Sequence, residues 1–245
     1  MKPTPLLGEF RAIGEFATVA ATGSLAAYLA PIGPPRPVLV IPGLITGDTA
    51  TLPMRAFLRS IGHRPHGWGQ GLNVGPANHS AEGVDILLTE LFEKYQTPID
   101  IVGWSAGGVF GRVLASHRTE MVRQVISLGS PIRLRTDETN ISGVSEFLSR
   151  FYMKGPSTID VDQIPVPSTT VWTASDGVVP PEACRQSVGD EAEVVQVRGS
   201  HTGLVANPAV FYLVADRLAL PLGEWAPFDP PSKLDRLYPS IENNR

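Results

Sequence analysis

Three residues that together could activate a hydroxyl nucleophile occur in this chain in the order Ser105, Asp176, His201. Ser105 stands in Gly-Trp-Ser-Ala-Gly, and Asp176 and His201 each follow a stretch predicted to be a strand. A serine hydroxyl is a weak nucleophile unless a base removes its proton and a third group orients that base. We therefore expect Ser105 as the nucleophile, His201 as the base and Asp176 as the residue that orients the histidine.

The turn around Ser105 is predicted to be sharp. The residues before it form a short apolar run, Ile99–Trp104 with Asp100 near its start, and a helical pattern follows from Ala106. A strand that turns directly into a helix forces its middle residue to positive φ and needs small neighbours, which Gly103 and Gly107 provide. Such a turn raises the hydroxyl above the sheet, with the first N–H groups of the helix behind it.

The other acids and histidines are placed less well for this chemistry. In an open parallel sheet the reacting groups lie beyond the carboxyl ends of the strands. Asp100 begins its strand and is therefore at the wrong end, whereas Asp137 follows a strand one position earlier and is the rival acid. None of the remaining histidines follows the last strand; they are His63, His66, His79 and His117.

These motifs resemble those of the α/β-hydrolase superfamily, in particular its bacterial esterases and lipases. The resemblance covers roughly residues 37–218 and rests on four places: the turn at Ser105, Pro42-Gly43-Leu44, Ser175–Pro180, and Gly199-Ser200-His201. It implies the chain order serine, acid, histidine and a lid or cap inserted after the strand that follows the nucleophile helix. Many lipases have His-Gly where this chain has Pro42-Gly43, a departure that matters little for the chemistry, because stabilising an oxyanion requires only a backbone N–H farther along the loop.

Acyl transfer also requires two N–H donors aimed at the developing oxyanion. We expect one to be the amide of Ala106, at the start of the helix. The loop after the first strand should provide the other, and Leu44 is preferred over Ile45. Apolar residues near this position suit an acyl chain; the expected pocket residues are Ile45, Trp104, Phe147, Phe151, Val178, Val179 and Leu204.

The order of elements predicts a single α/β domain over residues 1–245, with a mostly parallel central sheet flanked by helices. Unbroken apolar runs predict strands buried on both faces, and strands that alternate with helices predict a parallel sheet. Asn207 and Pro208 are typical of a helix start. Strands are expected at 38–41, 63–66, 99–104, 122–128, 168–173 and 192–197, helices at 51–60, 80–95, 106–117 and 208–219, and a loop at 67–76.

Three segments stand apart from this alternation. Residues 5–30 are predicted to form a helix of small residues packed on the body, and residues 221–245 a proline-rich tail on the surface. Residues 131–165 are predicted to insert a helix that is either a lid over Ser105 or an ordinary core helix. Its apolar stripe has helical spacing and consists of Val144, Phe147, Leu148, Phe151 and Tyr152.

Composition excludes several classes of function. The net charge of −4 and the absence of a basic run argue against a nucleic-acid partner. Cys184 is the only cysteine, so an internal disulfide and a cysteine-rich metal site are excluded. Asp48-Thr49 stands where a phosphate loop would need Gly-Lys-Thr. We expect neither metal nor cofactor.

The weakly hydrophobic segment 16–32 is too poor in large apolar residues for a membrane span and is preceded by acidic residues, unlike a signal peptide. We therefore expect a cytoplasmic protein. The leading hypothesis is a serine carboxylic-ester hydrolase that forms an acyl-enzyme from a small-molecule substrate, an apolar acyl ester. An acyltransferase, a thioesterase, a peptidase and a non-catalytic binding protein are the alternatives. Contact with a lipid surface and the oligomeric state stay open.

Overall fold

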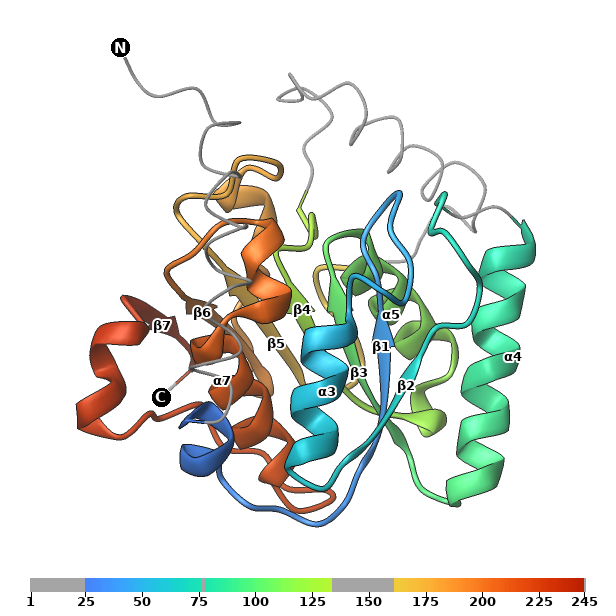
Figure 1. The fold of residues 1–245 in the computed structure, drawn as a ribbon, viewed down its shortest axis with the longest axis horizontal. Helices are drawn as coiled ribbons and strands as arrows, with labels where there is room; N and C mark the ends of the chain where they lie inside the picture. Colours follow the sequence, from blue (N-terminus) through green and yellow to red (C-terminus); the bar gives the residue numbers. More distant parts are fainter. Residues whose placement is uncertain (1–24, 76–77, 134–160, 245) are drawn as a thin grey trace.

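A seven-stranded sheet forms the centre of the computed structural model, which describes residues 25–75, 78–133 and 161–244 (Figure 1). The strand order is β2-β1-β3-β4-β5-β6-β7, and only β7 runs antiparallel to its neighbour. The strands are β1 (Pro37–Ile41), β2 (Arg64–Gly67), β3 (Ile99–Trp104), β4 (Val122–Leu128), β5 (Ser168–Trp172), β6 (Ala192–Gln196) and β7 (Ser240–Glu242). The predicted α/β fold with a mostly parallel sheet is confirmed.

Helices cover both faces of the sheet, as Figure 1 shows for α3 and α7 on one side and α5 on the other. The α-helices are α3 (Leu52–Ser60), α4 (Asn78–Tyr95), α5 (Ala106–His117) and α7 (Pro208–Ala219). Short 3₁₀ segments are η1 (Thr119–Met121), η2 (Pro181–Cys184), η3 (Thr202–Ala206) and η4 (Ser232–Leu237). All six predicted strands and four predicted helices are present within a few residues of their expected bounds.

Alternation along the strands divides the core into two clusters. Val102 and Trp104 of β3 pack with α3 and α7, whereas Ile99 and Ile101 pack with α4 and α5. Because successive side chains of a strand point to opposite faces, one strand contributes to both clusters. The side chain of Trp104, the residue before Ser105, therefore belongs to the α3 and α7 side of the sheet.

The start of α7 shows how local sequence sets an element boundary. Asn207 has extended backbone, and its side-chain oxygen accepts a hydrogen bond from the amide of Ala209 at 2.9 Å. Pro208 takes the first helical position, where its missing N–H costs nothing. This cap confirms the sequence prediction and places η3, which follows His201, directly before the helix.

The two ends of the predicted lid segment are held close together. The Ile132 amide donates to the carbonyl of Ala183, and the side chain of Arg133 forms an ion pair with Asp162 at 3.0 Å. The fully buried Arg112 of α5 donates to the carbonyls of Val161 and Asp162. The stripe from Val144 to Tyr152, and with it the choice between lid and core helix, lies outside the described residues.

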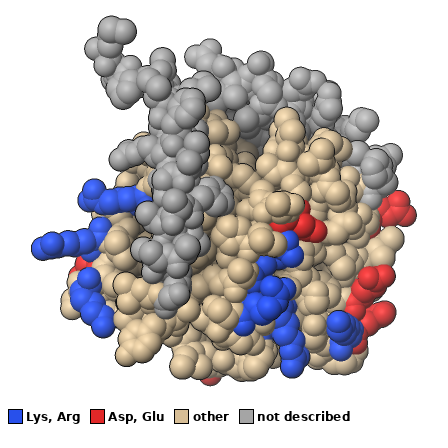
Figure 2. All heavy atoms as spheres, viewed as in Figure 1, with Lys and Arg blue, Asp and Glu red and all other residues tan. Residues whose placement is uncertain are grey.

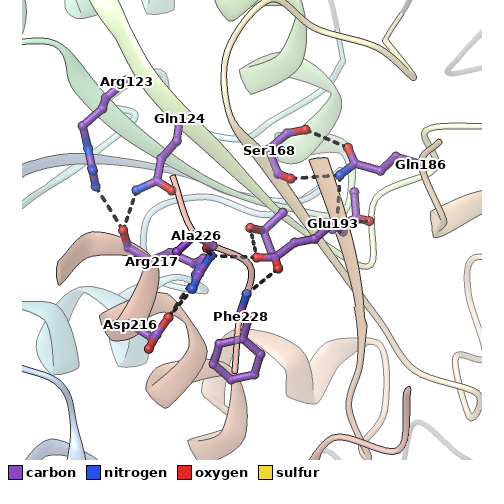
Figure 3. Close-up of polar contacts among 11 residues, drawn as sticks. Arg123, Gln124, Ser168, Gln186, Glu193, Asp216, Arg217, Ala226 and Phe228 are labelled. Carbon is purple, nitrogen blue, oxygen red and sulfur yellow. Dashed lines mark hydrogen bonds and ion pairs between the residues drawn. The ribbon is translucent and has the colours of Figure 1, made fainter. Parts of the chain in front are cut away.

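The end of the chain differs from the predicted surface tail. Residues 240–242 add β7 to the edge of the sheet, and Phe228 and Tyr238 are buried in the core. Figure 3 shows Arg217 and Glu193 at this junction, where Arg217 donates to the carbonyl of Ala226 and Glu193 accepts from the amide of Phe228. Apart from Phe228 and Tyr238, residues 221–244 are exposed or half-buried, as a tail on the surface should be. The prediction lacked the edge strand and the two buried aromatic side chains that hold the segment.

Only the last residues of the predicted N-terminal helix, 5–30, are described. Residues 25–29 are helical, and Ala26 and Ala30 are buried against the core cluster that includes α7. The remainder of that prediction lies outside the described residues. Within the described ranges, no helix combines the length and apolar character that crossing a membrane requires.

Candidate active site

Ser105 occupies a strained turn between β3 and α5. Its φ of 54° and ψ of −123° put it in a region that L-residues rarely adopt. A Cβ on Gly103 would overlap Gly107 and Gly108, and a Cβ on Gly107 would overlap the carbonyl oxygen of Ile41. The two glycines are therefore obligatory, because the turn closes by backbone-to-backbone contact. Ser105 itself is partly exposed, as a nucleophile must be.

Asp176 and His201 form a buried pair beyond the carboxyl ends of β5 and β6. The His201 Nδ1 and the Asp176 Oδ2 are 2.7 Å apart, and both side chains are almost fully buried. The second carboxylate oxygen of Asp176 accepts hydrogen bonds from the amides of Val178 and Val179 at 2.9 and 2.7 Å. The carboxylate is thus held from both sides, and the rival Asp137 lies outside the described residues.

Several contacts bring the serine turn and the histidine loop to one place. The indole of Trp104 donates to the His201 carbonyl at 3.1 Å, and its ring lies 5.8 Å from the imidazole. The Ser105 amide donates to the carbonyl of Leu128 at 2.8 Å. The next residue, Gly129, has positive φ, and a Cβ there would stand 3.1 Å from the His201 Nδ1. Ser105, Asp176 and His201 therefore share one edge of the sheet.

The loop after β1 lies against the same turn. A Cβ on Gly43 would be 3.2 Å from the Cβ of Ser105 and 3.2 Å from the ring of Trp104. The Ile45 amide is occupied, because it donates to the carbonyl of Asn73 at 2.7 Å. No hydrogen-bond acceptor for the amides of Leu44 and Ala106 is found among the described residues. The expected choice of Leu44 over Ile45 agrees with this arrangement.

Comparison with solved structures identifies the architecture. Aspergillus fumigatus lipase B superposes with a TM-score of 0.59 at 16% identity, over 78% of this chain and 55% of the lipase. The pyrethroid hydrolase PytH gives 0.58 at 16% identity over 78% and 100%, and a monoacylglycerol lipase from Paleococcus ferrophilus gives 0.56 at 15% identity over 77% and 96%. The chain has the α/β-hydrolase fold.

The α/β-hydrolase fold is shown here by structure and not by sequence. No protein-family model matches the chain, and no curated protein sequence is significantly similar to it. This chain spans about half the length of the fungal lipase. At these identities the likeness carries the arrangement of strands and helices, whereas the chemistry must be argued from this chain's own residues.

The residues expected to form an acyl pocket differ in burial in this α/β-hydrolase fold. Leu204 and Val179 are completely or almost completely buried, and Trp104 is 6% exposed and part of the core. Val178 is partly buried, whereas Ile45 is 74% exposed at the outside of its loop. Phe147 and Phe151 lie outside the described residues. A pocket lined by these seven residues stays a prediction.

Sequence reasoning missed two groups that hold the α/β-hydrolase loops. Asn73 is fully buried in the glycine-rich loop 67–76, where composition alone indicated only loop. The Thr173 hydroxyl donates to the carbonyl of Gly199 at 2.7 Å and so joins the loop of Asp176 to that of His201. Neither residue has a sequence signal, because their partners are backbone carbonyls distant in the chain.

Charged side chains occur in the loops near this site, with Asp48 in the loop after β1 and Arg198 in the loop that carries His201. On the face seen in Figure 2, most coloured charges lie in the lower part and at the two sides. Asp48, in the loop between β1 and α3, is turned inward and accepts from the amides of Trp68 and Gly69. Among residues 25–75, 78–133 and 161–244, no group of three or more His, Cys, Asp or Glu side chains could hold a metal ion.

Proposed function

We propose that this protein is a serine hydrolase that cleaves uncharged carboxylic esters through an acyl-enzyme on Ser105. The observation that carries the proposal is the buried 2.7 Å contact between His201 and Asp176, at the sheet edge where the strained turn exposes Ser105. A histidine oriented by a buried carboxylate is what a serine nucleophile requires. The α/β-hydrolase fold, shared with lipases and a pyrethroid hydrolase, agrees with this chemistry.

His201 is the proposed general base. With Nδ1–H donating to Asp176, His201 is in the tautomer whose Nε2 carries the lone pair, and Nε2 takes the proton from the Ser105 hydroxyl as the oxygen attacks the ester carbonyl. Asp176 does not accept that proton; it fixes the tautomer and stabilises the imidazolium. Because the carboxylate also accepts two backbone hydrogen bonds, its orientation does not depend on the histidine alone.

The amides of Leu44 and Ala106 are the proposed oxyanion donors. As the carbonyl becomes tetrahedral, its oxygen gains negative charge, and each donor contributes about 3 kcal/mol to the transition state. Collapse of the intermediate breaks the bond to the alcohol, which leaves with the proton from His201. Water then attacks the acyl-enzyme by the same route, releases the acid and restores the Ser105 hydroxyl.

The substrate class follows from charge. The arrangement offers an imidazole, a buried carboxylate that is already paired, and two amides. The cations of the neighbouring described loops are Arg133, which pairs with Asp162, and the exposed Arg198. An acyl ester without charge near the scissile bond fits best. A thioesterase or an acyltransferase would use the same acyl-enzyme and would differ in the leaving group or in the acceptor, so the assay must compare these directly.

The test combines covalent labelling with a substrate panel. A fluorophosphonate should label the wild type at Ser105, as shown by peptide mass mapping, and should not label Ser105→Ala. Nitrophenyl esters from acetyl to long-chain acyl, matched acyl thioesters, and an added alcohol acceptor then separate the three activities. A folded protein that is labelled elsewhere or not at all would refute the nucleophile, whereas faster turnover of thioesters would reassign the substrate class.

A further inference from the structure

The polar side chain of Asn73 is completely buried in the glycine-rich loop between β2 and α4, immediately beside the loop that follows β1. Polar groups are rarely buried without a full set of partners, because an unpaired one costs free energy. Asn73 is outside the set Ser105, Asp176 and His201, yet it is attached to the loop that carries Leu44. This raises the question of what its hydrogen bonds hold in place.

All four hydrogen-bonding groups of Asn73 are used. The side-chain Nδ2 donates to the carbonyl of Pro42 at 2.8 Å, and the side-chain oxygen accepts from the Gly75 amide at 3.1 Å. The orientation of the side-chain amide is determined, because the Gly75 amide can only donate and the Pro42 carbonyl can only accept. The backbone of Asn73 donates to the Thr46 carbonyl at 2.8 Å and accepts from the Ile45 amide at 2.7 Å.

These bonds enclose Leu44. Pro42 is two residues before it, and Ile45 and Thr46 follow it directly. Asn73 therefore holds the loop on both sides of the Leu44 amide, which has no acceptor among the described residues. Because the Ile45 amide donates to Asn73, Leu44 is the available donor of the two candidates, Leu44 and Ile45.

The backbone of the loop after β1 is strained at Ile45, so other contacts must stabilise its conformation. Ile45 has a φ of 59°, and a β-branched side chain at positive φ costs about 1–2 kcal/mol. Its side chain is 74% exposed, so packing of that side chain does not repay the strain. The hydrogen bond from the Ile45 amide to Asn73 and the tight turn from Gly43 to Thr46 are what keep the conformation.

We infer that Asn73 is a positioning residue for the oxyanion-stabilising loop: it holds the Leu44 amide toward Ser105 in advance of the reaction. The inference rests on the proposed function and deepens it. A preorganised donor is effective because no reorganisation is needed when charge develops, and a displacement of about 1 Å can cost 10²-fold in rate. Asn73 contributes no atom to the reacting groups and acts only through the loop.

The test compares Asn73→Ala with a matched buried amide at the other end of the sheet. Gln186 is 3% exposed, and its side-chain amide donates to the carbonyls of Ser168 and Glu193 and accepts from the Ser168 hydroxyl. Figure 3 shows these contacts at the start of β5. Gln186→Ala therefore removes a similar set of buried hydrogen bonds far from Ser105 and reports the effect of lost stability alone.

Both variants should lower the urea midpoint of unfolding. Asn73→Ala alone should lower kcat by about 10- to 100-fold, with KM changed less than threefold. It should also weaken, by a similar factor, inhibition by an alkyl trifluoromethyl ketone, which forms a tetrahedral oxyanion on Ser105. Thr46→Val is the second variant, because it removes only the hydroxyl bond to the Gly43 carbonyl and should shift both readouts in the same direction by a few-fold.

The outcomes separate the two proposals. If the wild type is active and Asn73→Ala behaves like Gln186→Ala, with kcat and the inhibition constant unchanged per folded molecule, the positioning role of Asn73 is refuted and the proposed function stands. If Asn73→Ala does not fold, Asn73→Ser takes its place, because the serine hydroxyl keeps a polar group in the buried site but is too short to bridge the Gly75 amide and the Pro42 carbonyl. An unchanged inhibition constant in Asn73→Ser refutes the positioning role equally. A folded wild type that neither cleaves esters nor reacts at Ser105 overturns the proposed function and this inference together.

Discussion

His63 is buried next to two arginines and should make the protein sensitive to mild acid. It precedes β2, is 4% exposed, and its Nδ1 accepts the backbone N–H of Arg36 at 3.1 Å. Burial, together with the positive charges of Arg123 and Arg36, lowers the pKa of His63 from 6.5 to about 4. In the folded protein His63 therefore stays neutral down to about pH 4, whereas in the unfolded chain it begins to bind a proton near pH 6.5.

The sign and size of the effect follow from proton linkage. As pH falls through 6.5 the unfolded state binds a proton at His63 that the folded state refuses until pH 4, so the free energy of unfolding decreases with falling pH. The loss attributable to His63 is about 1 kcal/mol at pH 6 and about 2 kcal/mol at pH 5, relative to pH 7.5. Full loss, near 3 kcal/mol, is reached below pH 4.

The assay is urea unfolding followed by tryptophan fluorescence at pH 7.5, 6 and 5 for the wild type, His63→Asn and His117→Asn. Asparagine keeps an acceptor for the Arg36 amide but does not titrate, so His63→Asn should lack this 2 kcal/mol decline whatever its stability at pH 7.5. The exposed His117 at the end of α5 is the control, and its variant should retain the wild-type decline. An equal decline in all three proteins would refute the buried neutral histidine.

Three further predictions concern the turn, the chain end and the acid. Gly107→Ala should destabilise by at least about 3 kcal/mol in urea unfolding, because its Cβ would overlap the Ile41 carbonyl; Gly189→Ala, whose Cβ would meet only one atom at 3.5 Å, should be tolerated. Arg217→Met should lower the free energy of unfolding by about 3–5 kcal/mol, because buried Glu193 loses its ion-pair partner. Limited proteolysis after residue 220 should then become faster, and an unchanged rate would contradict the role of Arg217 in holding the chain end. Asp176→Asn should lower kcat about 10³–10⁴-fold in an ester assay without preventing folding, and near-normal turnover would exclude Asp176 as the orienting acid.

Local sequence was sufficient for the elements and for the order of the reactive residues. The apolar runs Pro37–Ile41 and Ile99–Trp104 are buried throughout, as an internal parallel strand requires. The glycines beside Ser105 predicted a sharp turn, because backbone can approach backbone only where no Cβ intervenes. The resemblance to α/β-hydrolases then supplied the fold class, which the structural comparison confirms.

The strand order and the paired loops could not be read from the sequence. Asn73 meets Pro42 across 31 residues, and Thr173 meets Gly199 across 26, through bonds to backbone carbonyls that leave no trace in residue type. The same holds for β7, whose short and unremarkable sequence becomes a strand only because β6 offers an open edge. Such contacts depend on where the sheet brings distant loops.

Residue types and spacing therefore determined that a serine, an acid and a histidine would each follow a strand of the sheet, because catalytic chemistry restricts side chains and sheet topology restricts their order. Tertiary structure alone decided that the Ile45 amide donates to Asn73, whereas the Leu44 amide has no acceptor among the described residues. It also decided that Trp104 packs in the core and donates to His201. Backbone groups are identical in every residue, so only their positions in space distinguish a paired amide from an available one.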